Sequence, residues 1–456
     1  MKLEILQRLY NACNPDEPLD PADPRNVKID EMGTAEHRVR GANWVSRLAR
    51  QIELSGSTPV CRYFTGLRGT GKSTELRRLA ERLGRQDGAH LFTVVIDAEE
   101  ALDLTAEVDI PDILASLVFG AERAVLKLEG RDPDDALTDG FGRRFWSWLT
   151  RTDVTVSSID TGLQAGVVEG RIVAEMKTRP TLRQRLRSIV STHLTSFLRE
   201  VHEEIRSLEA RAKKRGYAGL FLVFDSLEKL QGTSTSWEQV LQSAERVFAS
   251  DAPYLQLPVH VLYTIPPALV LRLKVDVHYL PMIKLHEQSG EPFAAGFAAA
   301  REIVRRRIED VYAREIFGAV SGEARIKRLI EWSGGYPREI VRLLQSMLEI
   351  EDDMNQASFE RVLSHQADAY RRIVLASGAV DWLASVVVDR ALVIDGDERR
   401  MAADRMLSNN VVLRYLNSVE WFDVHPAVRD LEQLQQAVER LRAARDSVGS
   451  KPPVAG

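Results

Sequence analysis

The sequence has few of the features that mark secreted, membrane-spanning or metal-binding proteins. Its only cysteines, Cys13 and Cys61, have no metal-ligand neighbours at useful spacing, so we expect two reduced thiols rather than a disulfide framework. No apolar run approaches the ~20 residues that cross a bilayer. The first residues, Met1 to Glu4, do not resemble a secretory signal. These absences predict a soluble, cytoplasmic protein with no membrane partner.

A strong excess of charge of one sign is also missing. The chain has 61 basic and 66 acidic residues and a net charge of −5. This balance argues against a protein that coats nucleic acid over its whole surface, although one basic face stays open. The histidines are scattered without a ligand pattern. Length and a hydrophobic content of 44% allow about two to four domains with a sizeable core.

Short apolar strands alternate with helical periodicities along the first two thirds of the chain. The predicted strands cover residues 60–65, 91–97, 220–225, 259–264 and 280–285, and the predicted helices include 42–54, 73–85, 110–128 and 181–214. The run at 220–225 is continuously apolar and ends in a carboxylate, which is typical of a central parallel strand. The pattern therefore predicts an α/β fold, a parallel sheet with helices on both faces.

Composition and periodicity divide the chain into five predicted segments. These are an N-terminal strap with four closely spaced prolines, a core domain with an insertion, a helical lid, a helical domain like a winged helix, and a flexible tail. Their boundaries are 1–35, 36–290 with the insertion at about 105–215, 291–356, 357–445 and 446–456. The insertion includes a predicted β-hairpin at 153–176, and the wing is predicted from a strand pair near 411–415 and 421–424.

The most specific motif is Gly66-Leu67-Arg68-Gly69-Thr70-Gly71-Lys72-Ser73, which fits G-x-x-x-x-G-K-[ST] at every fixed position. Glycines allow the backbone N–H groups to curl around phosphate oxygens, and the following helix directs its positive end at the same anion. Lys72 is expected to meet the β- and γ-phosphates and Ser73 to ligate Mg²⁺. The predicted cofactors are ATP and Mg²⁺, and the predicted cofactor-binding residues of this loop are Gly66, Arg68, Gly69, Thr70, Gly71, Lys72, Ser73 and Thr74.

Three polar residues at strand ends complete the predicted chemistry. Asp225 ends a buried strand, where such folds hold the hydration shell of Mg²⁺. Glu228 is a candidate general base, and the competing reading is an acid that answers a helix dipole. Thr264 ends the next strand and could hydrogen-bond the attacking water or the γ-phosphate, or simply cap a turn before Pro266.

Two arginine features add further hypotheses. In Trp332-Ser333-Gly334-Gly335-Tyr336-Pro337-Arg338-Glu339, the glycines end one helix and Pro337 starts the next, which places Arg338 against the positive end of the helix. An anion near Arg338 is therefore predicted, with the γ-phosphate as a candidate, and an ordinary solvated arginine is the alternative. The arginines at 301 and 305–307 form a basic helix cluster that could act on a neighbouring subunit or on nucleic acid, but a solvated or acid-paired helix face is favoured.

With these motifs in place, residues 36–345 resemble the AAA+/STAND ATPases, and Asp225-Ser226-Leu227-Glu228 is also similar to the origin-recognition branch of AAA+. In the resemblance, Thr264 matches the sensor-1 position, Gly335-Tyr336-Pro337 the G-x-P motif and Arg338 the sensor-2 position. Arg40-Gly41 looks like the segment that contacts adenine. Ser226 stands where most AAA+ members carry a second acid, so Glu228 is the substitute base.

The resemblance implies an ATPase, and three functions stay open. The favoured one is a regulatory switch in which ATP drives closure and homo-oligomerisation, as in STAND proteins of bacterial signalling and antiviral defence, with a separate partner effector protein. The second is a DNA-engaging ATPase of the initiator or loader kind, which the acidic balance disfavours. The third is a nucleotide-bound scaffold with little turnover.

Overall fold

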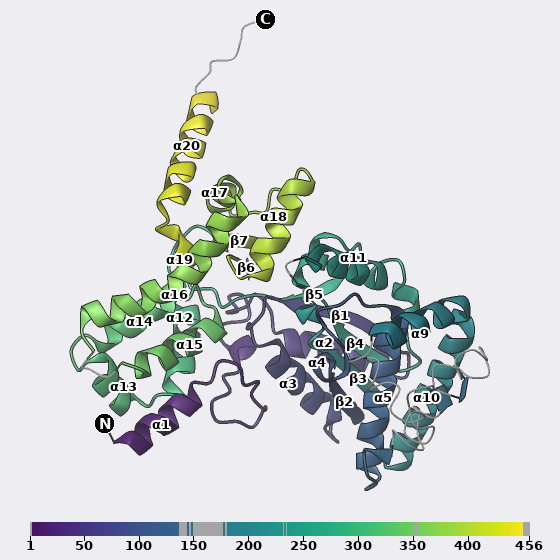
Figure 1. The fold of residues 1–456 in the computed structure, drawn as a ribbon. Coiled ribbons are helices and arrows are strands. Elements are labelled where there is room, and N and C mark those ends of the chain that lie inside the picture. The colour runs from purple at the N-terminus through teal and green to yellow at the C-terminus, as the bar shows by residue number, and fades with distance from the viewer. Residues whose placement is uncertain are drawn as a thin grey trace, which may run out of the picture. The chain divides into compact units, whose positions relative to one another are not determined.

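The computed structural model describes residues 2–135, 144–145, 147–148, 177, 180–230, 232–233, 235–350 and 354–449. The chain forms two compact units. One, here called the sheet unit, consists of residues 45–65 and 75–279. The other, here called the loop unit, consists of residues 1–44, 66–74 and 280–456. Figure 1 shows the elements in chain order, from α1 (Leu3–Ala12) in purple to α20 (Glu432–Gly449) in yellow.

A five-stranded sheet forms the centre of the sheet unit, in the order β2-β3-β4-β1-β5. Its strands are β1 (Cys61–Gly66), β2 (Leu91–Asp97), β3 (Gly219–Asp225), β4 (His260–Thr264) and β5 (Val277–Leu280). The pairs β2–β3, β3–β4 and β1–β4 are parallel. Because parallel strands need long crossovers, the helices between them cover the sheet. This arrangement confirms the predicted α/β fold class.

Strand β3 is the central strand that its apolar run predicted, since every one of its residues is buried. Leu222 and Phe224 join the core cluster with residues of α5 and α10. Phe221 and Val223 point to the opposite face of the pleated strand and are also fully buried. The sheet is therefore covered on both faces. The surrounding helices are α2 (Trp44–Ser55), α3 (Lys72–Gly84), α4 (Ala98–Ala101), α5 (Ile110–Leu128), α9 (Pro180–Thr192), α10 (Leu194–Lys214) and α11 (Trp237–Phe248).

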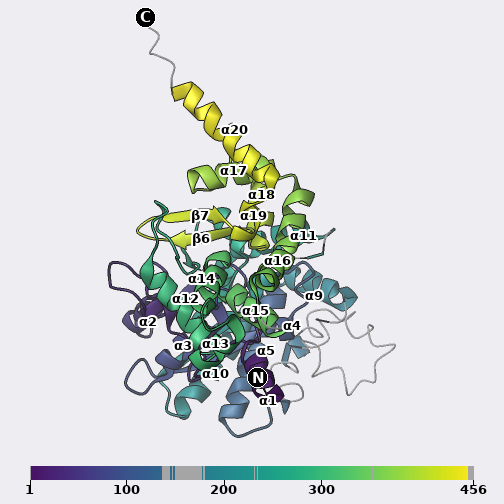
Figure 2. The same ribbon diagram turned by 90° about the vertical axis from the view of Figure 1, so that its left-hand side faces the viewer.

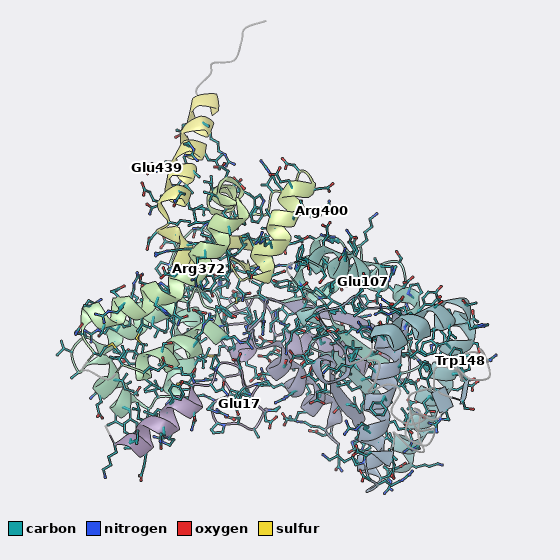
Figure 3. All side chains as sticks on the ribbon, viewed as in Figure 1. Glu17, Glu107, Trp148, Arg372, Arg400 and Glu439 are labelled. Carbon is teal, nitrogen blue, oxygen red and sulfur yellow. The ribbon has the colours of Figure 1, made fainter. Side chains whose placement is uncertain are left out.

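The predicted insertion folds around α5 and α10. Helix α5 starts with a capping box between Asp109 and Asp112, which satisfies backbone donors that the first turn leaves unpaired. Trp148, labelled in Figure 3, stacks on Phe145 with ring centroids 5.9 Å apart and lies 5.8 Å from Phe197 of α10. The insertion thus extends the apolar core of the sheet unit. The β-hairpin predicted at 153–176 lies outside the described residues.

The lid predicted at 291–356 is a set of helices in the loop unit, α12 (Ala294–Arg305), α13 (Asp310–Phe317), α14 (Gly322–Trp332) and α15 (Pro337–Leu348). Helix α1 packs on α15. Between α1 and Trp44 the strap follows the lid, and Arg307 donates to the carbonyl of Arg25 at 3.4 Å. The prolines exclude long helices from this strap, so backbone and side-chain hydrogen bonds hold it.

The C-terminal part of the loop unit is helical with one hairpin. Its helices are α16 (Gln356–Ser377), α17 (Val380–Asp389), α18 (Asp397–Ser408), α19 (Pro426–Arg429) and α20. Strands β6 (Val412–Leu416) and β7 (Glu420–Val424) pair antiparallel and lie side by side in Figure 2. Tyr415 and Trp421 stack across this pair with centroids 4.4 Å apart. The strand pair predicted for a wing is confirmed, and residues 450–456 of the predicted tail lie outside the described residues.

One predicted strand is shifted along the chain. The sequence placed the fifth strand at 280–285, whereas β5 ends at Leu280. The following backbone N–H groups instead bond to separate segments of the loop unit, Met282 to the carbonyl of Arg414, Ile283 to Gly335 and Lys284 to Val39. An apolar run alone does not distinguish a strand from an extended segment with such mixed partners.

No helix among the described residues is long and apolar enough to cross a membrane.

Candidate functional site

The phosphate-loop motif has the local context that its chemistry requires. Strand β1 ends at Gly66 and helix α3 starts at Lys72. Gly69 has a φ of +83° and Gly71 a φ of +94°. L-residues with a side chain rarely adopt this region, which explains glycine at both positions. The loop lies entirely in the loop unit.

The first two carbonyls of the loop accept hydrogen bonds from side chains of the loop itself. The Lys72 ammonium donates to the carbonyls of Gly66 at 3.0 Å and Leu67 at 3.1 Å. The Thr70 hydroxyl also donates to the Leu67 carbonyl, at 3.0 Å. Both Lys72 and Thr70 are buried. These bonds turn the start of the loop back on itself and close it around its own lysine.

The next three carbonyls are held by distant segments of the loop unit. Asn410 donates its side-chain amide to the carbonyl of Arg68 at 3.2 Å. The backbone N–H of Arg338 donates to the carbonyl of Gly69 at 3.3 Å, and the Arg40 guanidinium donates to the carbonyl of Thr70. In a planar trans peptide the C=O and N–H point in opposite directions. The N–H groups of Gly69 and Gly71 therefore point away from these partners.

Arg40 belongs to a buried ion pair. Its guanidinium lies 3.6 Å from the carboxylate of Asp30, and the side chains are 1% and 0% exposed. Asp30 also accepts the backbone N–H of Trp44 at 3.1 Å, where α2 begins. Trp44 in turn donates its indole N–H to the Arg40 carbonyl at 3.3 Å. Arg40 is thus fixed on the phosphate loop, while its predicted contact with adenine stays a prediction.

Gly41 lies beside Arg40 and packs against the C-terminal hairpin. Its φ is +73°, and a Cβ there would lie 2.7 Å from the Cγ of Leu416. The segment predicted to contact adenine is therefore bounded by the end of β6. This close approach explains why glycine occupies position 41 without reference to any ligand.

The glycine pair and Pro337 form the helix junction that the sequence predicted. Helix α15 starts at Pro337, with Tyr336 as its extended N-cap residue. A Cβ at Gly69 would lie 2.6 Å from the Tyr336 ring. The guanidinium of Arg338 donates to the carbonyl of Pro15 at 3.1 Å and lies 3.4 Å from the carboxylate of Asp16. The anion beside Arg338 in this structure is thus a strap carboxylate, and its contact with the γ-phosphate stays a prediction.

The predicted acids lie at the end of β3 in the sheet unit. Asp225 is 5% exposed and accepts the backbone N–H of Ser226 at 2.7 Å. Ser226 has a φ of +70° and precedes a short 3₁₀ helix, Leu227–Lys229, that contains Glu228. Glu228 is 7% exposed. A positive φ is unfavourable for a residue with a side chain, so surrounding contacts must stabilise it. Residues in this conformation cluster at functional sites.

Thr264 fixes this turn from the neighbouring strand. Its hydroxyl accepts the backbone N–H of Leu227 at 2.9 Å and donates to the carbonyl of Phe224 at 3.3 Å. Thr264 is fully buried. The residue therefore holds the β3 turn that carries both acids, and a contact with water or phosphate stays a prediction.

The basic cluster on α12 is engaged within the chain. Arg301 pairs with Glu323 at 2.8 Å and with Asp310 at 3.1 Å, and Arg305 pairs with Glu302 at 2.7 Å. Arg306 also pairs with Glu302 at 2.7 Å, and Arg307 donates to backbone carbonyls. Burial lowers the pKa of Arg307, and its Coulomb interaction with Cys13 opposes this shift. In these contacts the arginines of this helix face pair with acids and backbone carbonyls of the chain, as the favoured interpretation of the sequence expects.

The structure brings the predicted residues together in two sets. The loop unit gathers Arg40, Gly41, the loop from Gly66 to Thr74, Pro337 and Arg338, and the sheet unit gathers Asp225, Glu228 and Thr264. Sequence reasoning assigned no role to Asp30, Tyr336 or Asn410. Tyr336 lies within the G-x-P motif, and an aromatic residue directly after two glycines is a pattern that could have identified it. Asp30 and Asn410 carry no comparable signal because their partners are distant in sequence.

Several solved structures are similar to the chain, whereas searches by sequence give no match. No protein-family model matches the chain, and no curated protein matches it by sequence. Among solved structures, the chain is similar to a Walker-type ATPase of Pyrococcus abyssi, at 14% identity and a TM-score of 0.39, over 86% of this chain and 95% of that one. It is also similar to the ORC2 protein of Aeropyrum pernix, at 14% identity and a TM-score of 0.37, over 96% and 98% of the two chains. A third similar structure is Drosophila ORC bound to DNA, at 11% identity and a TM-score of 0.36, over 95% and 91%.

Proposed function

We propose that the chain binds ATP on the loop from Gly66 to Ser73 and hydrolyses it slowly, as a regulatory switch. The observation that supports this most is the loop backbone. The carbonyls of five consecutive residues, 66–70, each accept a hydrogen bond from a partner in the loop unit. A loop whose carbonyls are held in this way leaves the N–H groups of Gly69 and Gly71 on the opposite side of their peptides, where a phosphate would accept hydrogen bonds from them.

We propose that the ligand is a nucleoside triphosphate with Mg²⁺. Oxygen ligands suit Mg²⁺, and the family resemblance assigns this role to the Ser73 hydroxyl of the loop unit and the Asp225 carboxylate of the sheet unit. When bound, Mg²⁺ would neutralise charge on the phosphates. Lys72 would contribute a cation to the phosphates, and Glu228 would accept the proton of the attacking water.

The regulatory part of the proposal draws on the lid and the strap. Arg338, from the lid, is engaged by the strap residues Pro15 and Asp16. Asp16 is 77% exposed, and an ion pair with such an exposed carboxylate contributes less than about 1 kcal/mol, so a γ-phosphate could compete for the arginine. We infer that ATP exchanges the partner of Arg338, closes the lid and promotes self-association, with a separate effector protein as the output, as STAND signalling and defence proteins do.

The DNA-engaging alternative has less support. Its candidate contact was the arginine cluster on α12, and those arginines pair with acids and carbonyls of the chain itself. These pairs are as weak as the one at Arg338, so the acidic balance of the chain, with a net charge of −5, is the main observation against a DNA-engaging function. A scaffold would hold ATP without hydrolysing it, so a measurement of phosphate release distinguishes it from the switch.

Calorimetry with Mg-ATP, beside phosphate release, tests the central claim. The unaltered chain should bind ATP and release phosphate, and Lys72→Ala should lose detectable ATP binding because the cation that meets the phosphates is gone. A matched control is Lys213→Ala, which removes a surface lysine paired with Glu209. Equal ATP affinity in Lys72→Ala and Lys213→Ala would refute the proposal.

Light scattering separates the regulatory readings. Mass should be measured without nucleotide, with ADP and with a slowly hydrolysed ATP analogue, beside phosphate release with and without duplex DNA. Assembly that grows only with the analogue and ignores DNA supports the switch. A monomer whose turnover rises with DNA would replace the switch with the DNA-engaging function.

A further inference from the structure

Asn410 connects the C-terminal hairpin to the phosphate loop. It lies between α18 and β6 and is 8% exposed. One side-chain amide nitrogen donates to the carbonyl of Arg68 at 3.2 Å and to the hydroxyl of Tyr336 at 3.0 Å. Because an amide NH₂ carries two hydrogens, both contacts can form at once.

The backbone explains why asparagine suits this position. Asn410 has a φ of +55°. Asparagine tolerates this left-handed conformation better than most residues with a side chain. Glycine would fit the backbone but could not reach the loop, and aspartate would offer no donor to a carbonyl. The combination of a left-handed turn and a buried donor therefore favours asparagine.

Tyr336 contacts the next residue of the same loop. Its ring lies so close to Gly69 that a Cβ there would come within 2.6 Å of it. Burial raises the pKa of the Tyr336 hydroxyl. Asn410 and Tyr336 thus hold two adjacent residues, Arg68 and Gly69, from two segments that are themselves hydrogen-bonded.

The hairpin after Asn410 reinforces the same junction. The hydroxyl of Tyr415 in β6 donates to the carbonyl of Gly334 at 2.6 Å. Gly334 lies two residues before Tyr336, and a Cβ there would lie 2.6 Å from Leu413 of β6. The segment from Asn410 to Tyr415 therefore contacts the phosphate loop directly through Asn410 and indirectly through the glycine pair of the lid.

We propose that Asn410 is a positioning residue for phosphate binding, which holds the Arg68 peptide so that the Gly69 N–H is directed at the phosphates. The proposal rests on the proposed function, because it presumes that the loop binds a nucleotide. It goes beyond the motif, since the residue lies 342 positions from its loop partner. Asn410 touches the loop and not the nucleotide, so its effect is on the orientation of a donor.

Two substitutions at this position separate positioning from stability. Asn410→Gly removes the amide and leaves a backbone that accepts positive φ, whereas Asn410→Ala removes the amide and adds backbone strain. Asn410→Ala should therefore unfold at lower denaturant than Asn410→Gly. Both should lose the same ATP affinity, about 2- to 10-fold, as expected for one lost hydrogen bond that orients a donor.

The control is the neighbouring Asn409, which is exposed and donates its amide to the carbonyl of Arg405 at 2.8 Å. Asn409→Gly should leave ATP affinity unchanged. Tyr336→Phe keeps the ring on Gly69 and the bond from Asn410 to Arg68, so it should change affinity by less than about 2-fold. The double variant Asn410→Gly/Tyr336→Phe should bind ATP no more weakly than Asn410→Gly alone, because the shared contact is already lost.

The measurements are ATP and ADP affinity by calorimetry and unfolding of the nucleotide-free chain by denaturant. Unchanged ATP affinity in Asn410→Gly, with normal binding by the unaltered chain, would overturn the positioning role alone. Affinity that falls in proportion to stability across Asn410→Gly, Asn410→Ala and Asn409→Gly would also overturn it. Failure of the unaltered chain to bind ATP would overturn the proposed function and this role with it.

Discussion

The phosphate loop and the β3 turn carry the two parts of the proposed chemistry, and they are held in different ways. The loop carbonyls of Arg68 and Thr70 accept from residues 342 and 30 positions away. The β3 turn is held by the carboxylate of Asp225, which accepts the Ser226 N–H, and by Thr264 on the adjacent strand β4. The geometry of the loop therefore depends on how the strap, the lid and the C-terminal hairpin pack, while the turn depends on the sheet.

This difference suits a switch. Interfaces between packed segments tend to have a few discrete arrangements. A small movement of one segment can therefore break one set of interactions and form another. A turn at the end of a fully buried central strand has little freedom of this kind. We infer that regulation acts through the phosphate loop and that the acids stay fixed. Substitutions at each region test the comparison, and we give them from the largest expected effect to the smallest.

Arg40→Ala should have the largest effect, because it breaks a buried ion pair. Removal of the guanidinium leaves the Asp30 carboxylate, which is 0% exposed, without the cation 3.6 Å away. Such a change costs about 3–5 kcal/mol of unfolding free energy. It also removes a donor to the Thr70 carbonyl, so ATP affinity should fall. Urea unfolding and ATP calorimetry measure the two effects.

A nearby arginine supplies the control. Arg38 lies two residues earlier, and its guanidinium donates to the Glu31 carbonyl at 3.0 Å near the surface. Arg38→Ala should cost less than about 1 kcal/mol. If Arg40→Ala proved as stable as Arg38→Ala, long-range support of the loop through Arg40 would be excluded.

Glu228→Gln should affect turnover and leave binding intact. The amide has the shape of the acid but cannot take a proton, so phosphate release should fall about 100-fold while ATP affinity is unchanged. Single-turnover phosphate release with saturating Mg-ATP measures this. Glu99→Gln is the control, since it alters an exposed acid that pairs with Lys229 next to Glu228. Normal turnover in Glu228→Gln would return Glu228 to the role of an acid at the start of a helix and leave Asp225 as the remaining candidate.

The same contrast decides what the sequence could predict. The phosphate-loop motif, β3 and the helix start at Pro337 could be predicted, because each depends on residue types at short, fixed spacing. The strand pair at β6 and β7 could also be predicted, from alternation over a few residues. These features are local, and local chemistry is visible in a linear pattern.

The supports of the loop could not be predicted in this way. Nothing around Asp30 distinguishes it from other strap acids, and the role of Asn410 depends on a left-handed turn that brings its amide to Arg68. The sequence assigned Arg40 to adenine and Arg338 to phosphate, while the structure shows the intramolecular partners that each side chain has. Such partners follow from tertiary packing, which a single sequence does not reveal at a separation of hundreds of residues.

Thr264→Val should have the smallest effect and should be confined to the turn. Valine matches the shape of threonine, but it leaves the N–H of Leu227, a fully buried residue, without its acceptor. The expected loss of unfolding free energy is about 1–3 kcal/mol. Turnover should fall because the turn carries Asp225 and Glu228, while ATP affinity should change little because the loop partners are untouched.

Thr264→Ser keeps the hydroxyl and should restore both stability and turnover. Urea unfolding, ATP calorimetry and phosphate release on both variants complete the comparison. A Thr264→Val chain with normal stability but no turnover would mean that the hydroxyl acts on water or phosphate, as the sensor-1 resemblance implies. A chain with lost ATP affinity would mean that the turn and the loop are coupled, and the contrast between a regulated loop and a fixed turn would have to be abandoned.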